Sequence, residues 1–161
     1  MCDNLLDTYR DVIFNTPNLN WLLLTKRAPN IKKYLPHDWR NGWDNVWLGV
    51  TVENRKHGLR RIDILRNTPA AIRFLSIEPL LEDLGTLDLT GIDWVIVGGE
   101  SGHKSKIRVM KKQWVMNIKK QCEEQGVPFL FKQWDGKSGR LLNGKEYSEY
   151  PVSCRNRPGL F

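Results

Sequence analysis

The sequence predicts an α/β fold in which parallel β/α repeats form a partial, TIM-like barrel of about five strands, followed by a C-terminal β-hairpin. The first observation is a set of five short, nearly continuous apolar runs at residues 21–24, 46–52, 72–77, 94–97 and 127–131. Such runs are typical of strands covered on both faces. The second is the helix-like or mixed segment between successive runs, because strand and helix in alternation predict a parallel sheet. An open doubly wound sheet and a complete barrel are also compatible with this order.

Apolar residues recur at helical spacing in segments 4–14, 53–67 and 111–126. The second of these places Leu59, Ile62 and Leu65 on one stripe with arginines around it. In the third, Gly126 is a natural C-terminal stop. We therefore expect amphipathic helices that pack one apolar stripe against the sheet.

The order of these predicted strands and helices divides the single domain into two parts. Residues 1–135 form the partial β/α barrel domain, and residues 136–161 form a C-terminal hairpin and tail that pack on it. Asn143 and Gly144 stand between two short strand-like pieces, which is a strong hairpin signal.

The amino-acid composition excludes some classes of protein and favours others. The 161 residues are 40% hydrophobic and 27% charged, as in an ordinary globular domain. No apolar run approaches the ~20 residues of a membrane span, so we predict no membrane partner. Three widely spaced cysteines argue against a disulfide framework and a zinc site, and they favour a reducing, cytoplasmic setting. The net charge of +7 favours acidic partners, although a soluble basic protein of another function fits as well.

Polar residues follow each predicted strand, and the carboxyl ends of parallel strands share one edge, where ligands bind in such folds. We call this set the strand-end rim. Its members are Thr25, Lys26, Arg27, Thr51, Glu53, Ser76, Glu78, Gly98, Gly99, Glu100, Ser101, Lys132 and Gln133.

The rim has a structural and a functional interpretation. Glu53, Glu78 and Glu100 each lie near an expected helix start, where the helix dipole favours a carboxylate. Gly98 and Gly99 fit a tight turn, or they let a ligand approach the backbone. Carboxylates and cations gathered at one edge either balance one another or meet a charged ligand.

A basic run at residues 103–112 follows the rim directly. We expect it to be extended and to present a surface for nucleic acid or another partner, with a solvated face as the alternative. Its cations are Lys104, Lys106, Arg108, Lys111 and Lys112. Trp39, Trp43 and Trp134 fall in expected loops, where they either pack in the core or stack on a base. We identify no catalytic residue, no metal-ligand spacing and no phosphate-binding motif.

Five ordered motifs carry a family resemblance: "LLLTKR", "NVWLGVTVEN", "TPAAIRFLSIEPLL", "DWVIVGGESG" and "GVPFLFKQW". Together they resemble a family of proteins carried by phages and other mobile elements, with a radical S-adenosylmethionine-like barrel. The resemblance runs from the start to about residue 151, and it implies a partial barrel of that type in the cytoplasm of a bacterial host.

The sequence departs from that family in its cysteines. Members normally begin with a Cys-x3-Cys-x2-Cys-type cluster that would hold an iron–sulfur centre, and Cys2, Cys122 and Cys154 cannot replace it. We therefore expect the chain to correspond to the later part of the family barrel, without a cofactor of its own. The resemblance leaves S-adenosylmethionine as a possible ligand, with Gly98, Gly99 and Glu100 at its amino group.

Three interpretations of the function follow. The first is a non-catalytic binding module of a phage or mobile element, directed at nucleic acid or a nucleoprotein complex such as a host-defence or CRISPR system. The second is the C-terminal part of a radical S-adenosylmethionine-like enzyme that binds a small anionic or nucleotide-like ligand at the rim. A decaying gene product without selected activity is a third. A partial barrel also leaves the strand at residues 21–24 as an open edge, which favours pairing with a second copy or another protein.

Overall fold

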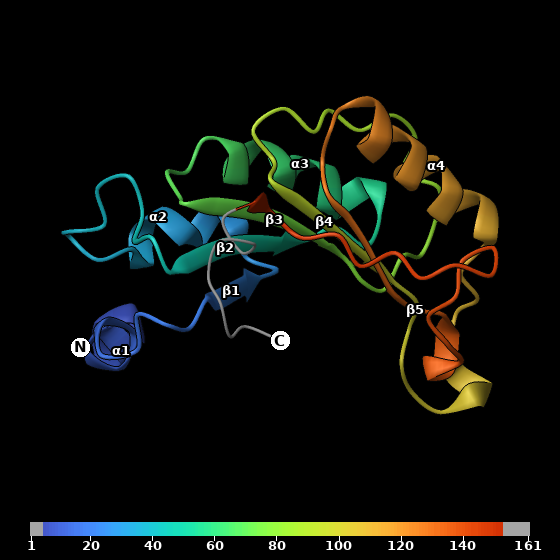
Figure 1. Cartoon of the computed structure of the whole chain (residues 1–161), viewed down its shortest axis with the longest axis horizontal. Helices are drawn as coiled ribbons and strands as arrows, with labels where there is room; N and C mark the ends of the chain where they lie inside the picture. The colour runs from blue at the N-terminus through green and yellow to red at the C-terminus, as the bar shows by residue number, and fades with distance from the viewer. Residues whose placement is uncertain (1–4, 153–161) are drawn as a thin grey trace.

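A computed structural model describes residues 5–152 and contains one five-stranded sheet (Figure 1). All neighbouring strands are parallel, and their order in space is β1-β2-β3-β4-β5. The strands are β1 (Trp21–Thr25), β2 (Val46–Thr51), β3 (Ile72–Ile77), β4 (Trp94–Gly98) and β5 (Phe129–Gln133). The predicted mixed α/β fold with a parallel sheet is confirmed. The order never reverses among these strands, so the sheet lacks the switch point of a doubly wound fold.

The expected alternation is wrong between β3 and β4, where residues 78–93 form no helix. Helices or 3-10 turns lie before β1, between the other successive strands and after β5. They are α1 (Leu5–Phe14), α2 (Ile31–Tyr34), α3 (Arg55–Arg66) and α4 (Lys112–Glu124), with 3-10 turns η1 (Ala28–Asn30), η2 (Lys104–Lys106) and η3 (Asp135–Lys137). Asn54 caps the start of α3, and its side-chain oxygen accepts a hydrogen bond of 2.9 Å from the His57 N–H. Figure 1 shows α3 and α4 on the same face of the sheet.

The main core lies between the sheet and these helices. Alternate strand residues point into it, among them Val50 on β2 and Leu75 on β3, both 0% exposed. We call the opposite surface the inner face. It holds a separate cluster of four buried residues, namely Trp47, Ile72, Phe74 and Trp94.

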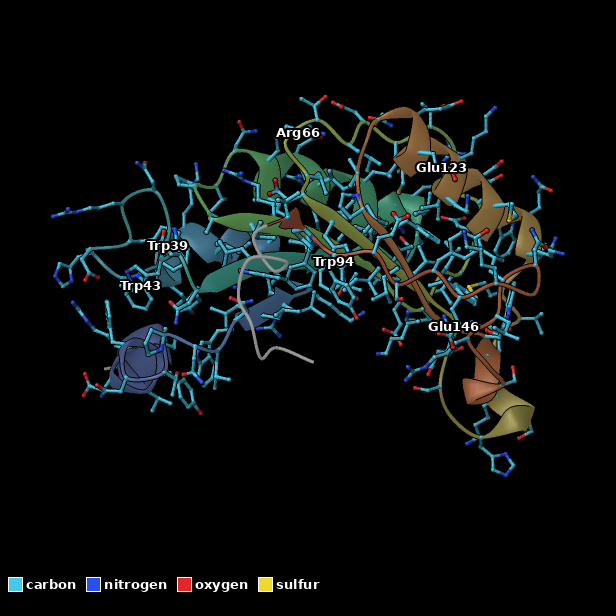
Figure 2. The ribbon with its side chains drawn as sticks, viewed as in Figure 1. Trp39, Trp43, Arg66, Trp94, Glu123 and Glu146 are labelled. Carbon is cyan, nitrogen blue, oxygen red and sulfur yellow. The ribbon has the colours of Figure 1, made fainter. Side chains whose placement is uncertain are left out.

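Gly49 on β2 makes the aromatic cluster of the inner face possible. A Cβ atom at Gly49 would lie 2.3 Å from the ring of Phe74, so only glycine lets that ring lie across the neighbouring strand. Trp94 meets Trp47 edge to face, with ring centroids 6.0 Å apart. Figure 2 shows Trp94 below the centre of the sheet, on the side away from α3 and α4.

The expectation that every strand is covered on both faces is wrong for β1. Partly buried and exposed residues alternate along this strand. Leu22 and Leu24, on the inner face, are 46% and 50% exposed. The physical reason is its position, since within residues 5–152 β1 has a neighbouring strand on one side only.

The C-terminal segment forms the expected turn but only a minimal hairpin. Asn143 and Gly144 have φ angles of 54° and 76°, as a tight hairpin turn requires, and one antiparallel bridge joins Leu142 to Lys145. The chain then returns to the sheet instead of extending the hairpin. The Glu149 N–H donates to the Phe129 carbonyl over 3.1 Å, which covers the free edge of β5.

Candidate functional site

The predicted rim residues come together at the carboxyl ends of the strands, and each of the three glutamates is in an ion pair. Glu53 follows β2 and receives Lys26 Nζ at 2.9 Å and Arg61 Nη1 at 2.5 Å. The same Arg61 nitrogen donates to the Thr51 carbonyl over 2.7 Å. Arg61 lies on α3 and was not among the predicted residues, because the rim was defined only by strand ends.

These contacts set the charge of Glu53. Burial alone would raise the pKa of this carboxyl, but the hydrogen bonds from Lys26 and Arg61 outweigh that effect and hold it below its usual value of 4.5. Glu53 is therefore ionised at neutral pH, and its charge is balanced within the protein.

Glu78 and Lys132 form the second pair across β4. Lys132 Nζ lies 2.9 Å from Glu78 Oε2, although the two side chains belong to the ends of β3 and β5. Gly98 stands between them on β4, and a Cβ atom there would lie 3.2 Å from the carboxyl carbon of Glu78. The absence of a side chain at Gly98 thus leaves room for the glutamate.

Gly99 is required by a different neighbour. A Cβ atom at this position would lie 2.4 Å from Asp135 Oδ1 and 2.6 Å from the Asp135 backbone nitrogen. Neither Gly98 nor Gly99 has a positive φ. Both glycines therefore serve close approach of the protein's own groups, and neither the turn nor the ligand of the sequence interpretation is needed to explain them.

Glu100 and Arg108 form the third pair and close the loop after β4. The Arg108 backbone N–H and Nε donate to Glu100 Oε2 over 2.9 and 3.0 Å, and Nη2 donates to Oε1. The side-chain hydrogen bond from Arg108 lowers the pKa of Glu100 from 4.5 to about 2. Arg108 was predicted as part of a partner surface, and here its guanidinium braces the loop.

Asp135 joins this loop to the loop after β5. Its carboxylate accepts hydrogen bonds from the Met110 N–H at 2.7 Å and the Glu100 N–H at 3.3 Å. The Gly136 N–H donates in turn to the Glu100 carbonyl over 2.9 Å. Asp135-Gly136 is a turn signal in the sequence, but its long-range partners are not readable from it. Figure 1 shows the two loops side by side, projecting from the sheet.

The basic run differs in shape from the expectation. Residues 104–106 form the 3-10 turn η2, so the prediction of an extended stretch is wrong there. The side chain of Lys104 lies outside the described part of the chain. Lys106 and Lys112 are exposed, and neither forms an ion pair with a described residue. Lys111 precedes α4, with its ammonium 5.2 Å from the centre of the Trp114 ring.

The other rim residues contribute backbone or hydroxyl groups. Thr25 Oγ1 accepts from the Arg27 N–H over 2.9 Å, and the Gln133 carbonyl accepts from the Gly99 N–H over 2.9 Å. Thr51 and Ser76 are buried side by side on β2 and β3. Ser101 is exposed.

A pocket of about 450 Å³ lies on the inner face and reaches the rim. Its apolar wall includes Leu22, Leu24, Phe74, Ile96 and Leu130. Its polar wall includes Ser76, Glu78, Lys132, Arg140, Glu146, Tyr147, Ser148 and Tyr150. The volume and the mixture of apolar and polar groups are those of a small-molecule site. Two carboxylates and two cations balance the charge of the lining.

Two of the loop tryptophans belong to the core. Trp39 and Trp43 are 4% and 9% exposed, with ring centroids 5.5 Å apart, and Figure 2 shows them together near α1. The Trp39 indole donates to the Pro69 carbonyl over 2.8 Å. Trp134 packs on Phe131 and donates to the Leu141 carbonyl over 2.9 Å. Of the two interpretations, packing is therefore the one that holds for Trp39 and Trp43.

Within residues 5–152, no three His, Cys, Asp or Glu side chains are grouped so that they could hold a metal ion. No helix in that range has the length and apolar character needed to cross a membrane. No curated protein and no solved structure matches the sequence. One family model matches residues 1–151, nearly the whole chain. The chain therefore belongs to the family described as "Protein of unknown function (DUF5131)".

Proposed function

We propose that the chain is a non-catalytic binding module of a phage or mobile element, directed at nucleic acid or a nucleoprotein complex. The observation that carries the proposal is which charged side chains around the loop after β4 are paired and which are not. Glu100 is neutralised by Arg108, whereas the exposed cations Lys106 and Lys112 have no described carboxylate partner. A loop braced by internal hydrogen bonds and followed by a helix start, which together present unpaired cations, is suited to phosphate contacts.

The charge of the protein as a whole also supports binding to nucleic acid. The three glutamates of the rim are each paired within the protein, so they do not present free negative charge beside the loop. The chain as a whole carries a net charge of +7, which attracts polyanions over about 10 Å at ordinary salt.

We further propose that the sheet is part of a TIM-like barrel of the radical S-adenosylmethionine type. A strand order that never reverses, with α3 and α4 on one face, supports this. In this proposal the module acts in the bacterial cytoplasm, where a host-defence complex built on nucleic acid is a fitting target.

Fluorescence anisotropy with labelled DNA and RNA tests the nucleic-acid proposal. We expect binding that weakens steeply with salt, and a salt slope that falls by about 2 in the double variant Lys106→Glu/Lys112→Glu. Lys32→Glu/Lys33→Glu on α2 is the matched control, because each double reversal subtracts four charges from +7 and leaves +3. If both double variants lost the same amount of nucleic-acid affinity, net charge alone would explain the binding. That result would refute a binding site formed by the loop after β4 and the start of α4.

The inner-face pocket favours a second function. Its balanced lining suits a small nucleotide-like ligand better than a polyanion, as expected for part of an enzyme that takes such a ligand or S-adenosylmethionine at the rim. In the same assay, competition by nucleotides or S-adenosylmethionine without any nucleic-acid binding would favour this function over the first.

A further inference from the structure

The edge of β1 that faces away from β2 presents backbone hydrogen-bonding groups that pair with no described strand. The Trp21 N–H donates to the Asn45 carbonyl beside β2 over 2.8 Å, so Trp21 faces β2. Successive residues of a strand direct their backbone groups to alternate sides. Leu22 and Leu24 therefore direct their N–H and C=O groups away from the sheet, where no described strand pairs with them.

This edge lacks the features by which proteins protect an open strand. Edge strands usually carry a charge, a proline or a bulge, and the sequence WLLLT of β1 has none of them. The opposite edge of the sheet is treated differently, because the returning segment pairs with β5 through Leu130 and Ser148. One edge of the sheet is therefore protected and the opposite edge is not. This difference indicates that the open edge of β1 is a binding surface.

The part of the chain that contains β1 also carries most of the exposed apolar side chains. Ten large hydrophobic residues are exposed in the described range, and seven of them lie between residues 9 and 34. These seven are Tyr9, Val12, Phe14, Leu19, Leu22, Leu24 and Tyr34. Leu22, Leu24 and Tyr34 line one surface groove beside β1. An apolar groove next to an open strand favours a partner that adds a strand.

Two exposed charges near the ends of β1 favour a particular partner and a particular orientation of its strand. Arg27, just after β1, is exposed and forms no ion pair with a described residue. Asp44 is an exposed carboxylate at the other end of the strand, next to the Asn45 that binds Trp21, and it also lacks a described ion pair. A copy of the same chain in antiparallel orientation would bring each Arg27 to the end that carries Asp44.

We propose that a second copy of this chain pairs with β1 in antiparallel orientation, about a two-fold axis at Leu23. Leu22 then lies opposite Leu24 of the second copy, and the two such pairs exchange about four backbone hydrogen bonds. The four leucine side chains meet on the inner face, and the two sheets become one continuous sheet. The surface is the same on both copies, as a closed dimer requires.

Sedimentation velocity of the full chain over a range of concentrations tests the dimer. We expect the unmodified chain to dimerise and Leu24→Lys to raise the dissociation constant about tenfold or more, because a lysine on an open edge opposes strand addition. Leu141→Lys is the matched control, since Leu141 is exposed to a similar extent, 55%, and lies in the C-terminal hairpin. The control should dimerise like the unmodified chain.

Oxidative cross-linking tests the register, in a background with Cys2→Ser and Cys154→Ser. Leu23→Cys should form an intermolecular disulfide, because a residue on the two-fold axis lies about 4.5 Å from its copy between Cα atoms. Leu22→Cys should not, since its two copies would lie about 8 Å apart. Arg27→Glu should weaken the dimer, and adding Asp44→Arg to the same chain should restore it.

Three results would overturn the proposal. A chain that stays monomeric at every concentration would leave no second copy on β1. A dimer that survives Leu24→Lys would use another surface. Cross-linking at residue 22 in place of residue 23 would contradict the two-fold register. Circular dichroism of each variant shows whether a loss of dimer reflects unfolding.

Discussion

Replacing Gly99 by alanine should destabilise the fold, because the new methyl group has no free space. Its Cβ atom would lie 2.4 Å from Asp135 Oδ1, 2.6 Å from the Asp135 nitrogen and 2.9 Å from the Trp134 carbonyl carbon. Two of these three atoms belong to the backbone that follows β5, so no side-chain rotation relieves the contact. The loop after β5 must move away from the loop after β4.

The size of the effect follows from what that movement breaks. Overpacking of this kind costs about 2 to 3 kcal/mol, which includes weakening of the hydrogen bonds that the Met110 and Glu100 N–H groups donate to Asp135. The adjacent Gly98→Ala is the matched control. The three atoms nearest to its Cβ atom all belong to the side chain of Glu78, the closest at 3.2 Å, and this side chain can shift, so we expect a cost below about 1 kcal/mol.

Urea unfolding followed by circular dichroism measures both changes. Gly99→Ala should lower the unfolding midpoint by roughly 1 M, and Gly98→Ala should move it by less than half as much. The reasoning fails if the two variants are equally stable, or if Gly98→Ala is the more damaging. Either outcome would mean that the glycine pair does not serve the internal contacts described above.

Two further predictions concern titratable groups. The folded pKa of Glu100, about 2, lies below its unfolded value of 4.5, so the stability that its ion pair provides is present above pH 4.5 and is lost as the pH falls through 2. A carboxyl NMR titration should show the low midpoint, and Arg108→Ala should return it toward 4.5; a midpoint near 4.5 in the unmodified chain would contradict the pairing. Burial raises the pKa of Cys122 to about 12. Mass spectrometry should find this thiol protected from iodoacetamide at pH 8 in the native chain and labelled in urea, whereas equal labelling would show that the site opens.

The strands were predictable because their apolar runs are short and bounded by turn residues. The predicted starts of the second, third and fourth strands match Val46, Ile72 and Trp94. The fifth strand begins two residues later than predicted, at Phe129, because Val127 still donates its N–H to the Cys122 carbonyl at the end of α4. An apolar run does not distinguish a helix end from a strand start.

The gathering of rim residues was predictable for a topological reason, and their pairing was not. Parallel strands bring Glu53, Glu78 and Glu100 to one edge whatever the strand order is. Which cation meets each glutamate depends on that order and on helix placement, as with Arg61 from α3. Asp135 could not be found either, because its partners lie 25 and 35 residues away in the sequence.

The internal pairing of the rim decides how the chain's positive charge can be used. Glu53, Glu78 and Glu100 together bind Lys26, Arg61, Lys132 and Arg108, so four cations are committed at this edge of the sheet. A polyanion that displaced them would leave three carboxylates close to its own charge, and the Coulomb cost would oppose binding. Under the proposed function, nucleic acid should therefore contact Lys106 in the projecting loop and Lys112 at the start of α4, while the balanced pocket on the inner face stays open to a small ligand. We therefore expect variants of Lys106 and Lys112 to leave the binding of a small ligand in the pocket unchanged.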